Sequence, residues 1–326
     1  MKIKHTIFLI VFIVICVLIY HKFFGYTIRY YLSIKNNINR IKRVENLNYI
    51  EQGKNYLRNE NLIITGTIRD GYPYLEKTLI NLYKDIIPLF KDYRILIVEN
   101  DSKDNTREIL LKYAEKDPKF IVLGCNGINK NKCIMKLEAT DMNKCPTCST
   151  RINKMVKIRN IYIDEIKKQI YNDFNMVLVI DFDLPGKLIE NGLFHTGYYF
   201  KTQPEIDAIC ALTMTETYHY HDPYAHIEEG NIKIPSFIFH DIILKKCKKG
   251  GMDKVSGCFN GITFYRKNSL IKNNYCTVVD KNNQAICEHD CLNQKLENVY
   301  INYNMIYLIN RSIVEKLINK MYKYFT

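Results

Sequence analysis

The sequence predicts an α/β domain in which helices flank a mostly parallel sheet, with a transmembrane helix at the N-terminus. Three observations lead to this prediction. Short apolar runs alternate with helical stretches between residues 59 and 300, which is the order that gives parallel strands covered by helices. Acidic and polar residues follow several of these runs where a strand would end. Near the N-terminus, Ile7–Tyr20 contains no charged residue.

The expected elements follow one another as strand and helix. Leu62–Ile68 reads as a buried strand, and Arg69-Asp70-Gly71 reads as the turn into a helix over Tyr74–Tyr83. The elements expected after these are a strand over Tyr93–Val98, a helix over Thr106–Lys116, a strand over Phe120–Leu123, a helix over Arg151–Tyr171 and a strand over Met176–Ile180. Strands joined by helices in this way pair in parallel.

Asp181 and Asp183 directly follow the last of these strands. Side chains alternate along a strand, so both carboxylates point the same way, and the turn Leu184-Pro185-Gly186 exposes them at the carboxyl edge of the sheet. Open α/β sheets bind ligands at this edge. Carboxylate oxygens suit Mg²⁺ or Mn²⁺, which bridge carboxylates and phosphates. An isolated D-x-D triplet is more often a pair of solvated loop carboxylates, and the apolar strand before it favours the metal site.

Four stretches between residues 60 and 300 have the order and spacing of a known family. They are Val98–Thr106, Arg151–Asn160, Val179–Asp183, and Ser256–Tyr265 followed by Cys287-Glu288-His289. In these stretches the chain resembles the GT-A glycosyltransferases, and in particular the fungal capsule-associated (α-1,3-)mannosyltransferases and their relatives in eukaryotes and large DNA viruses. The resemblance implies the GT-A fold, a Rossmann-like sheet that binds nucleotide-diphospho-sugars. It is much less specific for the sugar.

The resemblance also implies which residues bind the nucleotide sugar. They are Thr65, Arg69, Glu99, Asp101, Arg159 and Asn260. Arg69 and Arg159 suit phosphate, because a guanidinium group can donate two hydrogen bonds to its oxygens. Other interpretations remain open. The polar run that begins at Glu99 also fits an Asx-type turn with Thr106 capping the next helix, and Arg159 also fits a surface salt bridge.

Glu288, His289 and Asp290 bring three proton-active groups into one short segment. In an inverting enzyme a carboxylate here would take the proton of the acceptor hydroxyl. In a retaining enzyme His289 would instead be a further metal ligand beside Asp181 and Asp183. The first turn of a surface helix is a third interpretation. The sequence does not decide among the three.

The chain divides into four expected segments: a membrane anchor over residues 1–25, a basic stem over 26–58, a catalytic domain over 59–300, and a C-terminal strand and helix tail over 301–326. Residues 6–25 are long enough to span a bilayer when their polar ends reach the interface. No small-x-small site follows the apolar run, so an uncleaved anchor is favoured over a signal peptide.

The orientation of the anchor has two opposed indications. The basic residues that follow it, Lys22, Arg29, Lys35, Arg40, Lys42 and Arg43, outnumber those before it, which favours a cytoplasmic C-terminal domain. The family resemblance implies the opposite, a type II protein with a lumenal catalytic domain of the Golgi or ER kind, or a host or virion membrane if the source is viral. We expect the lumenal arrangement.

The chain has 11 cysteines, and one of them, Cys16, lies in the expected anchor. The other ten are an even number, which fits disulfides in an oxidising compartment. Four lie between the third strand and the long helix: Cys125, Cys133, Cys145 and Cys148. Paired disulfides, a structural zinc site and free thiols all remain open for this group.

The composition argues against a nucleic-acid partner. The formal net charge is +13, but Lys and Arg are dispersed along the chain and no nucleic-acid-binding module is present. A second cluster, Tyr218–His226, contains histidines, tyrosines and one aspartate. It could contact a sugar or ligate a metal, although such a cluster is more often a partly exposed loop.

Taken together, these features predict a membrane-anchored, metal-dependent glycosyltransferase that moves a hexose from a nucleotide sugar to a glycan or glycoprotein. The resemblance favours mannose from GDP-mannose, with Mn²⁺ or Mg²⁺ as the cation. The alternative is a catalytically inactive GT-A-like protein that serves as a membrane-tethered binding or assembly subunit. A nucleotidyltransferase would need a Gly-rich triphosphate loop after the first strand, and the sequence has none there.

Overall fold

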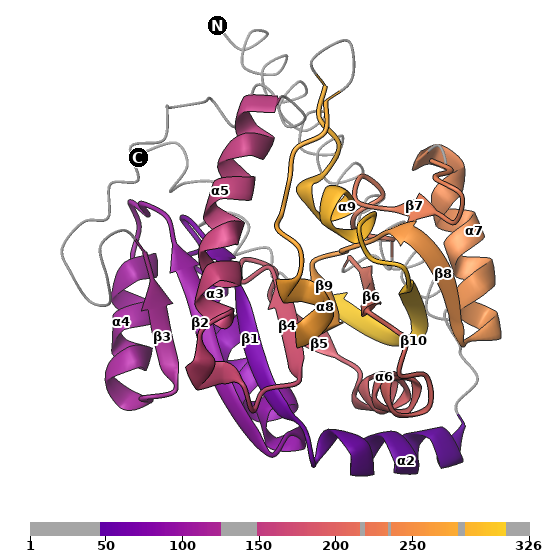
Figure 1. Ribbon diagram of the computed structural model, residues 1–326, viewed down its shortest axis with the longest axis horizontal. Helices are drawn as coiled ribbons and strands as arrows, with labels where there is room; N and C mark the ends of the chain where they lie inside the picture. The colour runs from indigo at the N-terminus through magenta and orange to yellow at the C-terminus, as the bar shows by residue number, and fades with distance from the viewer. Residues whose placement is uncertain (1–45, 125–148, 216–218, 234–235, 280–283, 311–326) are drawn as a thin grey trace, which may run out of the picture.

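A computed structural model describes residues 46–124, 149–215, 219–233, 236–279 and 284–310 (Figure 1). The expected anchor, most of the stem, and the group Cys125, Cys133, Cys145 and Cys148 lie outside these ranges. Within them, no helix combines the length and the apolar character needed to cross a bilayer.

The N-terminal half of the sheet is parallel, as expected. Its strands are β1 (Asn61–Ile68), β2 (Asp92–Glu99), β3 (Phe120–Leu123) and β4 (Met176–Ile180). They are arranged in the order β3-β2-β1-β4, and each neighbouring pair runs parallel. Their carboxyl ends therefore meet at one edge, and the polar residues that follow β1, β2 and β4 are brought together there.

The other half of the sheet is mixed. It continues from β4 in the order β9-β6-β10-β8-β7, with β5 paired to β10. The strands are β5 (Gly186–Leu188), β6 (Ala208–Met214), β7 (Ile227–Glu228), β8 (Met252–Gly257), β9 (Ile262–Arg266) and β10 (Val299–Ile309). Only β6 and β10 pair in parallel here, and β9 lies antiparallel to both of its neighbours. The expectation of a mostly parallel sheet therefore holds for the first half alone.

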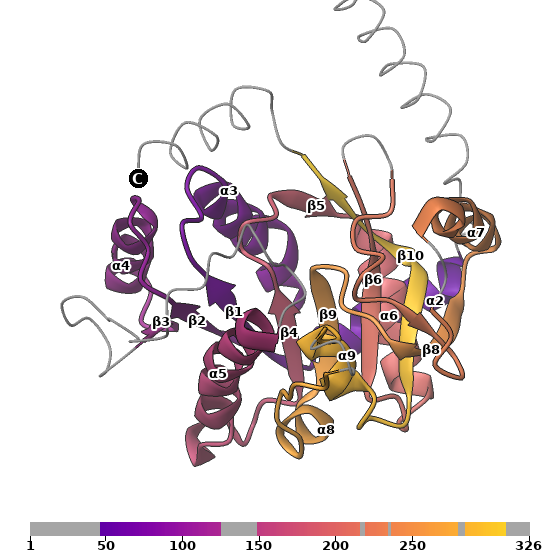
Figure 2. The same cartoon turned by 90° about the horizontal axis from the view of Figure 1, so that it is seen from above.

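Helices cover both faces of the sheet, and β1 shows why both need cover. Ile63 is buried in the core on one face, and Leu62 and Ile64 in the core on the other, so the strand is apolar on both sides. The first core contains residues of α5 (Ser149–Ile166), α7 (Ser236–Lys249), α8 (Lys267–Ile271) and α9 (Glu288–Asn293). The second contains residues of α2 (Leu47–Leu57), α3 (Tyr74–Asn81), α4 (Thr106–Lys116) and α6 (Glu190–Thr202). Figure 2 shows α5, α8 and α9 on the side of the sheet opposite α3.

The described residues also include three short helical turns, which follow α3 and α5. A π-helical turn over Leu82–Ile86 and a 3₁₀ turn over Ile87–Leu89 follow α3, and a 3₁₀ turn over Gln169–Tyr171 follows α5. The long helix expected to reach Tyr171 therefore ends at Ile166. Among these turns, the pyrrolidine ring of Pro88 fits the one over Ile87–Leu89, because proline is tolerated in a first helical turn.

Both expected boundaries of the catalytic domain move outward. The boundary at residue 300 falls inside β10, which pairs with β6, β8 and β5 in the interior of the sheet. The boundary at residue 59 leaves out α2, which packs against α6. Tyr49 of α2 stacks on Tyr198 of α6 with ring centroids 3.8 Å apart. The domain therefore includes residues from α2 to Ile309.

The contact between α2 and α6 is close enough to require glycine at position 53. A methyl group there would lie 1.7 Å from the carbonyl oxygen of Phe194. Alanine is about 1 kcal/mol better than glycine in an exposed helix, whereas overpacking costs about 1–3 kcal/mol. We therefore expect Gly53→Ala to lower the free energy of unfolding, measured by urea denaturation followed by circular dichroism. Glu51→Ala, at an exposed position of the same helix, should change it by less than about 0.5 kcal/mol. A stabilising Gly53→Ala would contradict the docking of α2 on α6.

Candidate active site

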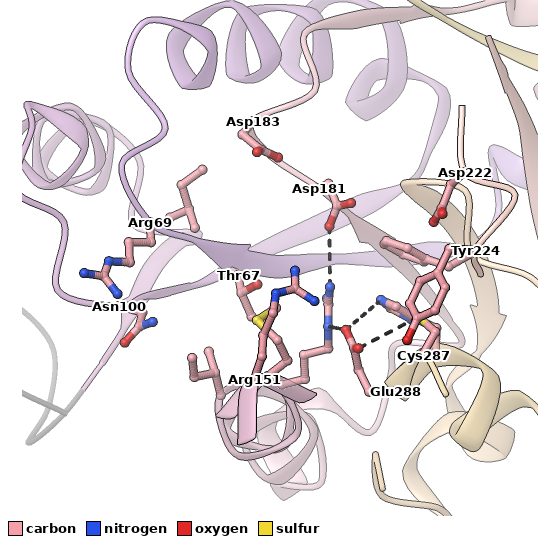
Figure 3. Close-up of a pocket in the computed structure, with 16 residues that line it drawn as sticks. Thr67, Arg69, Asn100, Arg151, Asp181, Asp183, Asp222, Tyr224, Cys287 and Glu288 are labelled. Carbon is pink, nitrogen blue, oxygen red and sulfur yellow. Dashed lines mark hydrogen bonds and ion pairs between the residues drawn. The ribbon is translucent and has the colours of Figure 1, made fainter. Parts of the chain in front are cut away.

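A pocket of about 350 Å³ opens at the carboxyl edge of β1, β2 and β4. Its two sides differ in charge (Figure 3). Arg69 and Asn100 lie on one side, Asp222, Tyr224 and Glu288 lie on the other, and Arg151 and Asp181 lie between them. A ligand with a phosphate group at one end and a group with a transferable proton at the other would match this division.

The acidic pair lies on the rim of this pocket, where the sequence places it. Asp181 and Asp183 both line it, and Phe182 between them is fully buried. The backbone N–H of Asp181 donates to the carbonyl oxygen of Gly261 at 2.9 Å. Gly261 has a φ of +77°, a conformation that glycine adopts without strain. The loop before β9 therefore fixes the backbone of the first carboxylate.

Arg159 joins the two acidic parts of the site. It lies on α5 with only 5 % of its side chain exposed, and its Nε donates to Glu288 Oε1 at 2.8 Å. Its Nη2 is 3.5 Å from Asp181 Oδ1. The rings of Phe259 and Tyr275 lie 5.3 Å and 5.7 Å from the guanidinium carbon. The surface salt bridge considered from the sequence is thus a buried one, between residues 129 positions apart in the chain.

Burial raises the pKa of Asp181, and the cation of Arg159 opposes this increase. Three further carboxylates, Asp183, Asp222 and Glu288, raise the pKa again through like-charge repulsion. The acidic side of the pocket therefore has more negative charge than Arg159 balances. A divalent cation would relieve this excess.

The chemistry of the donor set fits such a cation through Asp181 and Asp183, since oxygen ligands suit Mn²⁺ and Mg²⁺. Among the described residues, no three His, Cys, Asp or Glu side chains are grouped to hold a metal ion. The geometry therefore does not bring His289 together with Asp181 and Asp183 as a third ligand. Substrate phosphates and water can supply further ligands.

Glu99 and its neighbours mainly connect two loops. Glu99 is 1 % exposed, accepts a hydrogen bond from the backbone N–H of Ser102 at 2.6 Å and pairs with Arg107. Asp104 accepts from the backbone N–H groups of Tyr72 and Thr106 at 2.9 Å and 3.0 Å. These bonds link the loops that follow β1 and β2. The Asx-type turn considered from the sequence describes this run, but Thr106 does not cap α4: the N-cap is Asn105, and the Thr106 hydroxyl accepts from the backbone N–H of Gly71 at 2.7 Å. Glu99 does not line the pocket.

Thr65 and Asn260 also have structural contacts. Thr65 is fully buried, and its hydroxyl donates to the carbonyl oxygen of Leu96 at 2.7 Å. Asn260, with a φ of +56°, donates from Nδ2 to the carbonyl oxygen of Ala211 at 2.8 Å. Neither residue lines the pocket. Asp101 lies on the loop after β2 with a φ of +54°.

Two residues that the sequence analysis did not select line the pocket next to Thr65 and Glu99, which do not. Thr67, two residues after Thr65, lines the pocket. Asn100 also lines it, is 5 % exposed, and its Oδ1 has no hydrogen-bond partner among the described residues. A buried amide oxygen without a partner is unfavourable, so it is suited to accept a hydrogen bond from a ligand. The sequence does contain one indication for Asn100, because this residue directly follows the end of β2.

The segment after Cys287 forms the start of α9 and is buried. Glu288 and His289 line the pocket, and they are 4 % and 1 % exposed, which contradicts the surface-helix interpretation. Asp290 lies behind them, where burial raises its pKa to about 7, Lys233 opposes the increase, and Asp222 and Glu288 add to it. Asp290 does not line the pocket.

Asp222 and Tyr224 complete the acidic side of the pocket. They belong to the cluster Tyr218–His226, so two of its side chains lie at the site. Tyr224 donates to the carbonyl oxygen of Ala285 at 2.7 Å. This bond fixes the loop that carries Tyr224 beside the segment that leads into α9. Arg151, eight residues before Arg159 on α5, was also not selected from the sequence.

Two disulfides lie next to the pocket. Cys210 of β6 is bonded to Cys258, and Cys276 is bonded to Cys291 of α9. Cys258 precedes Phe259, which lines the pocket, and Cys291 follows Asp290. Cys247 and Cys287 are buried and form no disulfide within the described ranges.

Comparison with known proteins supports the glycosyltransferase interpretation. Residues 62–130 match the sequence profile of glycosyl transferase family 2, and this match covers the first strands of the sheet and the loops at the pocket. No curated protein matches the chain at a significant level. The match supports a glycosyltransferase and leaves the sugar and the acceptor open.

Several solved structures are similar to the chain at low identity. TarS 1–349 of S. aureus has 13 % identity and a TM-score of 0.44, and the match covers 77 % of this chain and 60 % of TarS 1–349. The mannosyltransferase PcManGT of Pyrobaculum calidifontis, in complex with GDP-Man and Mn²⁺, has 11 % identity and a TM-score of 0.45, with 89 % and 71 % covered. GalNAc-T7 with UDP, GalNAc and Mn²⁺ has 10 % identity and a TM-score of 0.46, with 77 % and 44 % covered.

Removing the cation of Arg159 should destabilise the protein strongly. We expect Arg159→Met to lower the free energy of unfolding by about 3 kcal/mol, because it leaves buried carboxylates without a partner. Urea denaturation followed by circular dichroism measures this change. The double variant Arg159→Met with Glu288→Gln should recover about 1 kcal/mol or more, since both charges are then absent.

The matched control is Arg94→Met. Arg94 pairs with Asp92 at 3.1 Å and is 30 % exposed, so its loss should cost about 0–1 kcal/mol. Equal losses for Arg159→Met and Arg94→Met would contradict the buried network.

Proposed function

We propose that this chain is a metal-dependent glycosyltransferase that transfers a hexose from a nucleotide sugar to a hydroxyl group of a glycan or glycoprotein. The observation that carries the proposal is the arrangement Asp181, Arg159 and Glu288 at the carboxyl edge of a parallel sheet. It combines a site for a cation and diphosphate with a carboxylate that can take a proton. The family 2 match over residues 62–130 supports the same reaction class.

The nucleotide would lie over the ends of β1 and β2. Thr67 and the unpaired amide oxygen of Asn100 are suited to hydrogen-bond the nucleoside. Arg69 on the same side and Arg151 in the middle of the pocket would supply positive charge for the diphosphate. The sugar would then point toward Asp181, Asp222 and Glu288.

The acceptor hydroxyl would attack C1 of the sugar from the side of Glu288. Its proton passes to the Glu288 carboxylate, the new C1–O bond forms, and the bond from C1 to the diphosphate oxygen breaks with its electron pair leaving on the diphosphate. This is general-base catalysis with inversion at C1, so the α-linked mannose of GDP-mannose would be transferred as a β-mannoside, and we take the donor, not the α-1,3 linkage, from the resemblance. A divalent cation held by Asp181 and Asp183 would offset the negative charge that grows on the leaving group.

Mannose from GDP-mannose is the donor that the resemblance to the capsule-associated mannosyltransferases favours. We also propose that the chain is related to the members of this family in large DNA viruses. An inactive, membrane-tethered relative predicts a different result, namely nucleotide-sugar binding without turnover.

Two variants separate donor binding from chemistry. Asp181→Asn should lower the affinity for the donor at least about tenfold in the presence of Mn²⁺, because a metal ligand is lost. Glu288→Gln should leave that affinity within about twofold and lower turnover by about a hundredfold or more, because the base is lost. Calorimetry with GDP-, UDP- and CMP-sugars, with and without Mn²⁺, measures binding, and release of nucleotide measures turnover.

Asp164→Asn is the control for charge, since Asp164 is 69 % exposed on α5 and pairs with Lys167. It should behave as the wild type in both assays. Donor binding that does not depend on a divalent cation would overturn the metal-dependent mechanism, and full turnover in Glu288→Gln would remove Glu288 as the base.

We further propose that the catalytic domain lies on the oxidising side of a membrane, anchored by residues 6–25. The pairs Cys210–Cys258 and Cys276–Cys291 support this side, because disulfides rarely persist in a reducing cytosol. They favour the lumenal arrangement over the cytoplasmic one that the basic stem suggests.

Alkylation tests this placement. We expect that protein from a eukaryotic secretory host, unfolded without reductant, reacts with a maleimide at Cys247 and Cys287 among the described cysteines. Cys210, Cys258, Cys276 and Cys291 should react only after reduction, because a disulfide has no thiol to alkylate. Peptide mass spectrometry identifies the sites. Labelling of Cys258 or Cys276 before reduction would contradict the oxidised state.

A further inference from the structure

A chain of polar side chains lies behind the pocket and ends at the proposed base. Tyr162 donates from its hydroxyl to the hydroxyl oxygen of Tyr275 at 2.7 Å. The Tyr275 hydroxyl lies 3.4 Å from Nδ1 of His289. Nε2 of His289 lies 3.9 Å from Oε1 of Glu288, and Arg159 contacts the same oxygen. Tyr162, Tyr275 and His289 are each less than 4 % exposed.

Aromatic contacts fix the plane of the His289 ring. The ring stacks on Phe259 with centroids 3.5 Å apart and an interplanar angle of 6°. The ring of Tyr275 meets it nearly at a right angle, with centroids 5.2 Å apart. Tilting the imidazole out of this plane would break both contacts, so the ring keeps the plane in which Nδ1 lies toward Tyr275 and Nε2 toward Glu288.

The order of hydrogen bonds assigns the position of the His289 proton. Burial, with the nearby cation of Arg159, lowers the pKa of His289 well below its ordinary value, so the ring is neutral and carries one N–H. Tyr162 gives its hydroxyl proton to the oxygen of Tyr275. Tyr275 in turn has its own proton available for Nδ1. The single N–H of His289 is therefore at Nε2.

This assignment distinguishes the two oxygens of Glu288. Oε1 faces the N–H groups of Arg159 and His289. Oε2 faces the thiol of Cys287 at 3.8 Å, and a thiol is a weak donor. Oε2 is therefore the oxygen that remains available to a substrate proton. The buried Nε2 has no hydrogen-bond partner within the described ranges, so the Glu288 carboxylate is the group nearest to satisfying it.

We propose that Tyr162 and Tyr275 are positioning residues that hold His289 as an Nε2–H donor toward Glu288, so that Oε2 of Glu288 takes the acceptor proton. The proposal deepens the proposed function and rests on it for the role of Glu288. It also separates His289 from metal binding, because a metal ligand needs a lone pair, whereas in this tautomer Nε2 carries the proton and the lone pair of Nδ1 faces the Tyr275 hydroxyl.

The first test observes the tautomer without any substrate. The full-length chain, labelled with ¹⁵N-histidine, is examined by long-range ¹H–¹⁵N correlation, and His289→Gln assigns the signals. We expect Nε2 to be protonated and Nδ1 unprotonated in the wild type. Tyr275→Phe removes the donor to Nδ1 and should shift the His289 signals toward a mixture of tautomers. A protonated Nδ1 in the wild type would overturn the proposal.

The second test measures turnover of GDP-mannose with Mn²⁺ and water as the acceptor, by release of GDP. Tyr275→Phe should lower kcat about tenfold to a hundredfold, as is usual when the partner of a functional group is lost, and leave KM for the donor unchanged. Tyr303→Phe is the matched control. Tyr303 is also buried, and its hydroxyl bonds Asp253 at 3.1 Å, away from the pocket, so kcat should stay within about twofold.

The outcomes distinguish a failure of the positioning role from a failure of the proposed function. A changed tautomer with unchanged kcat in Tyr275→Phe would overturn the positioning role. Absence of donor binding or turnover in the wild type, together with a protonated Nε2, would overturn the proposed function and leave the assignment of the tautomer intact. If Tyr303→Phe lowers kcat as much as Tyr275→Phe does, the loss in Tyr275→Phe is explained by general destabilisation, and the positioning role is overturned.

Discussion

The site depends on one buried cation shared by two carboxylates. Arg159 reaches Asp181 at the end of β4 and Glu288 at the start of α9, so a single side chain of α5 fixes how these two elements lie relative to each other. A buried ion pair contributes little net stability, because desolvation offsets the attraction. Its value here is geometric. The rings of Phe259 and Tyr275 around the guanidinium leave it few other positions, and the charges of the pocket are arranged about it.

The junction of β4 with β9 connects the two halves of the sheet. β9 pairs antiparallel with β4, and the carbonyl group of Gly261, just before β9, accepts from Asp181. The residues suited to phosphate come from the parallel half, while Asp222 and Glu288 come from the mixed half. A relative movement of the halves would break this hydrogen bond and the strand pairing next to it. The distance between the two ends of the pocket is therefore set by main-chain bonds.

The sequence was sufficient for the parallel half of the fold because its signals are local. Each of β1, β2 and β4 is an apolar run that ends in polar residues, and Asp181 and Asp183 follow β4 directly. Other features depend on contacts between distant residues, which one sequence does not reveal. The pairing of Arg159 with Glu288 is of this kind, and so is the interior position of β10, which a C-terminal run of apolar residues does not distinguish from a tail. Arg107 pairs with Glu99, so Asn100 and not Glu99 lines the pocket. An ion pair between a strand end and a helix eight residues later cannot be recognised from the sequence pattern.

The pocket is lined by uncharged side chains, Thr67 and Asn100, beyond the ends of β1 and β2. Glu99 is neutralised by Arg107, so Thr67 and the amide of Asn100 present uncharged groups where the nucleoside would lie, while Arg69 and Arg151 present charge to the diphosphate. Dissolved ions screen attraction between charges and have little effect on hydrogen bonds between neutral groups. Increasing ionic strength would therefore weaken every nucleoside-diphosphate donor to a similar degree and preserve the ranking among bases. Under the proposed function, affinity and base selectivity would therefore be set by different physical forces in this pocket.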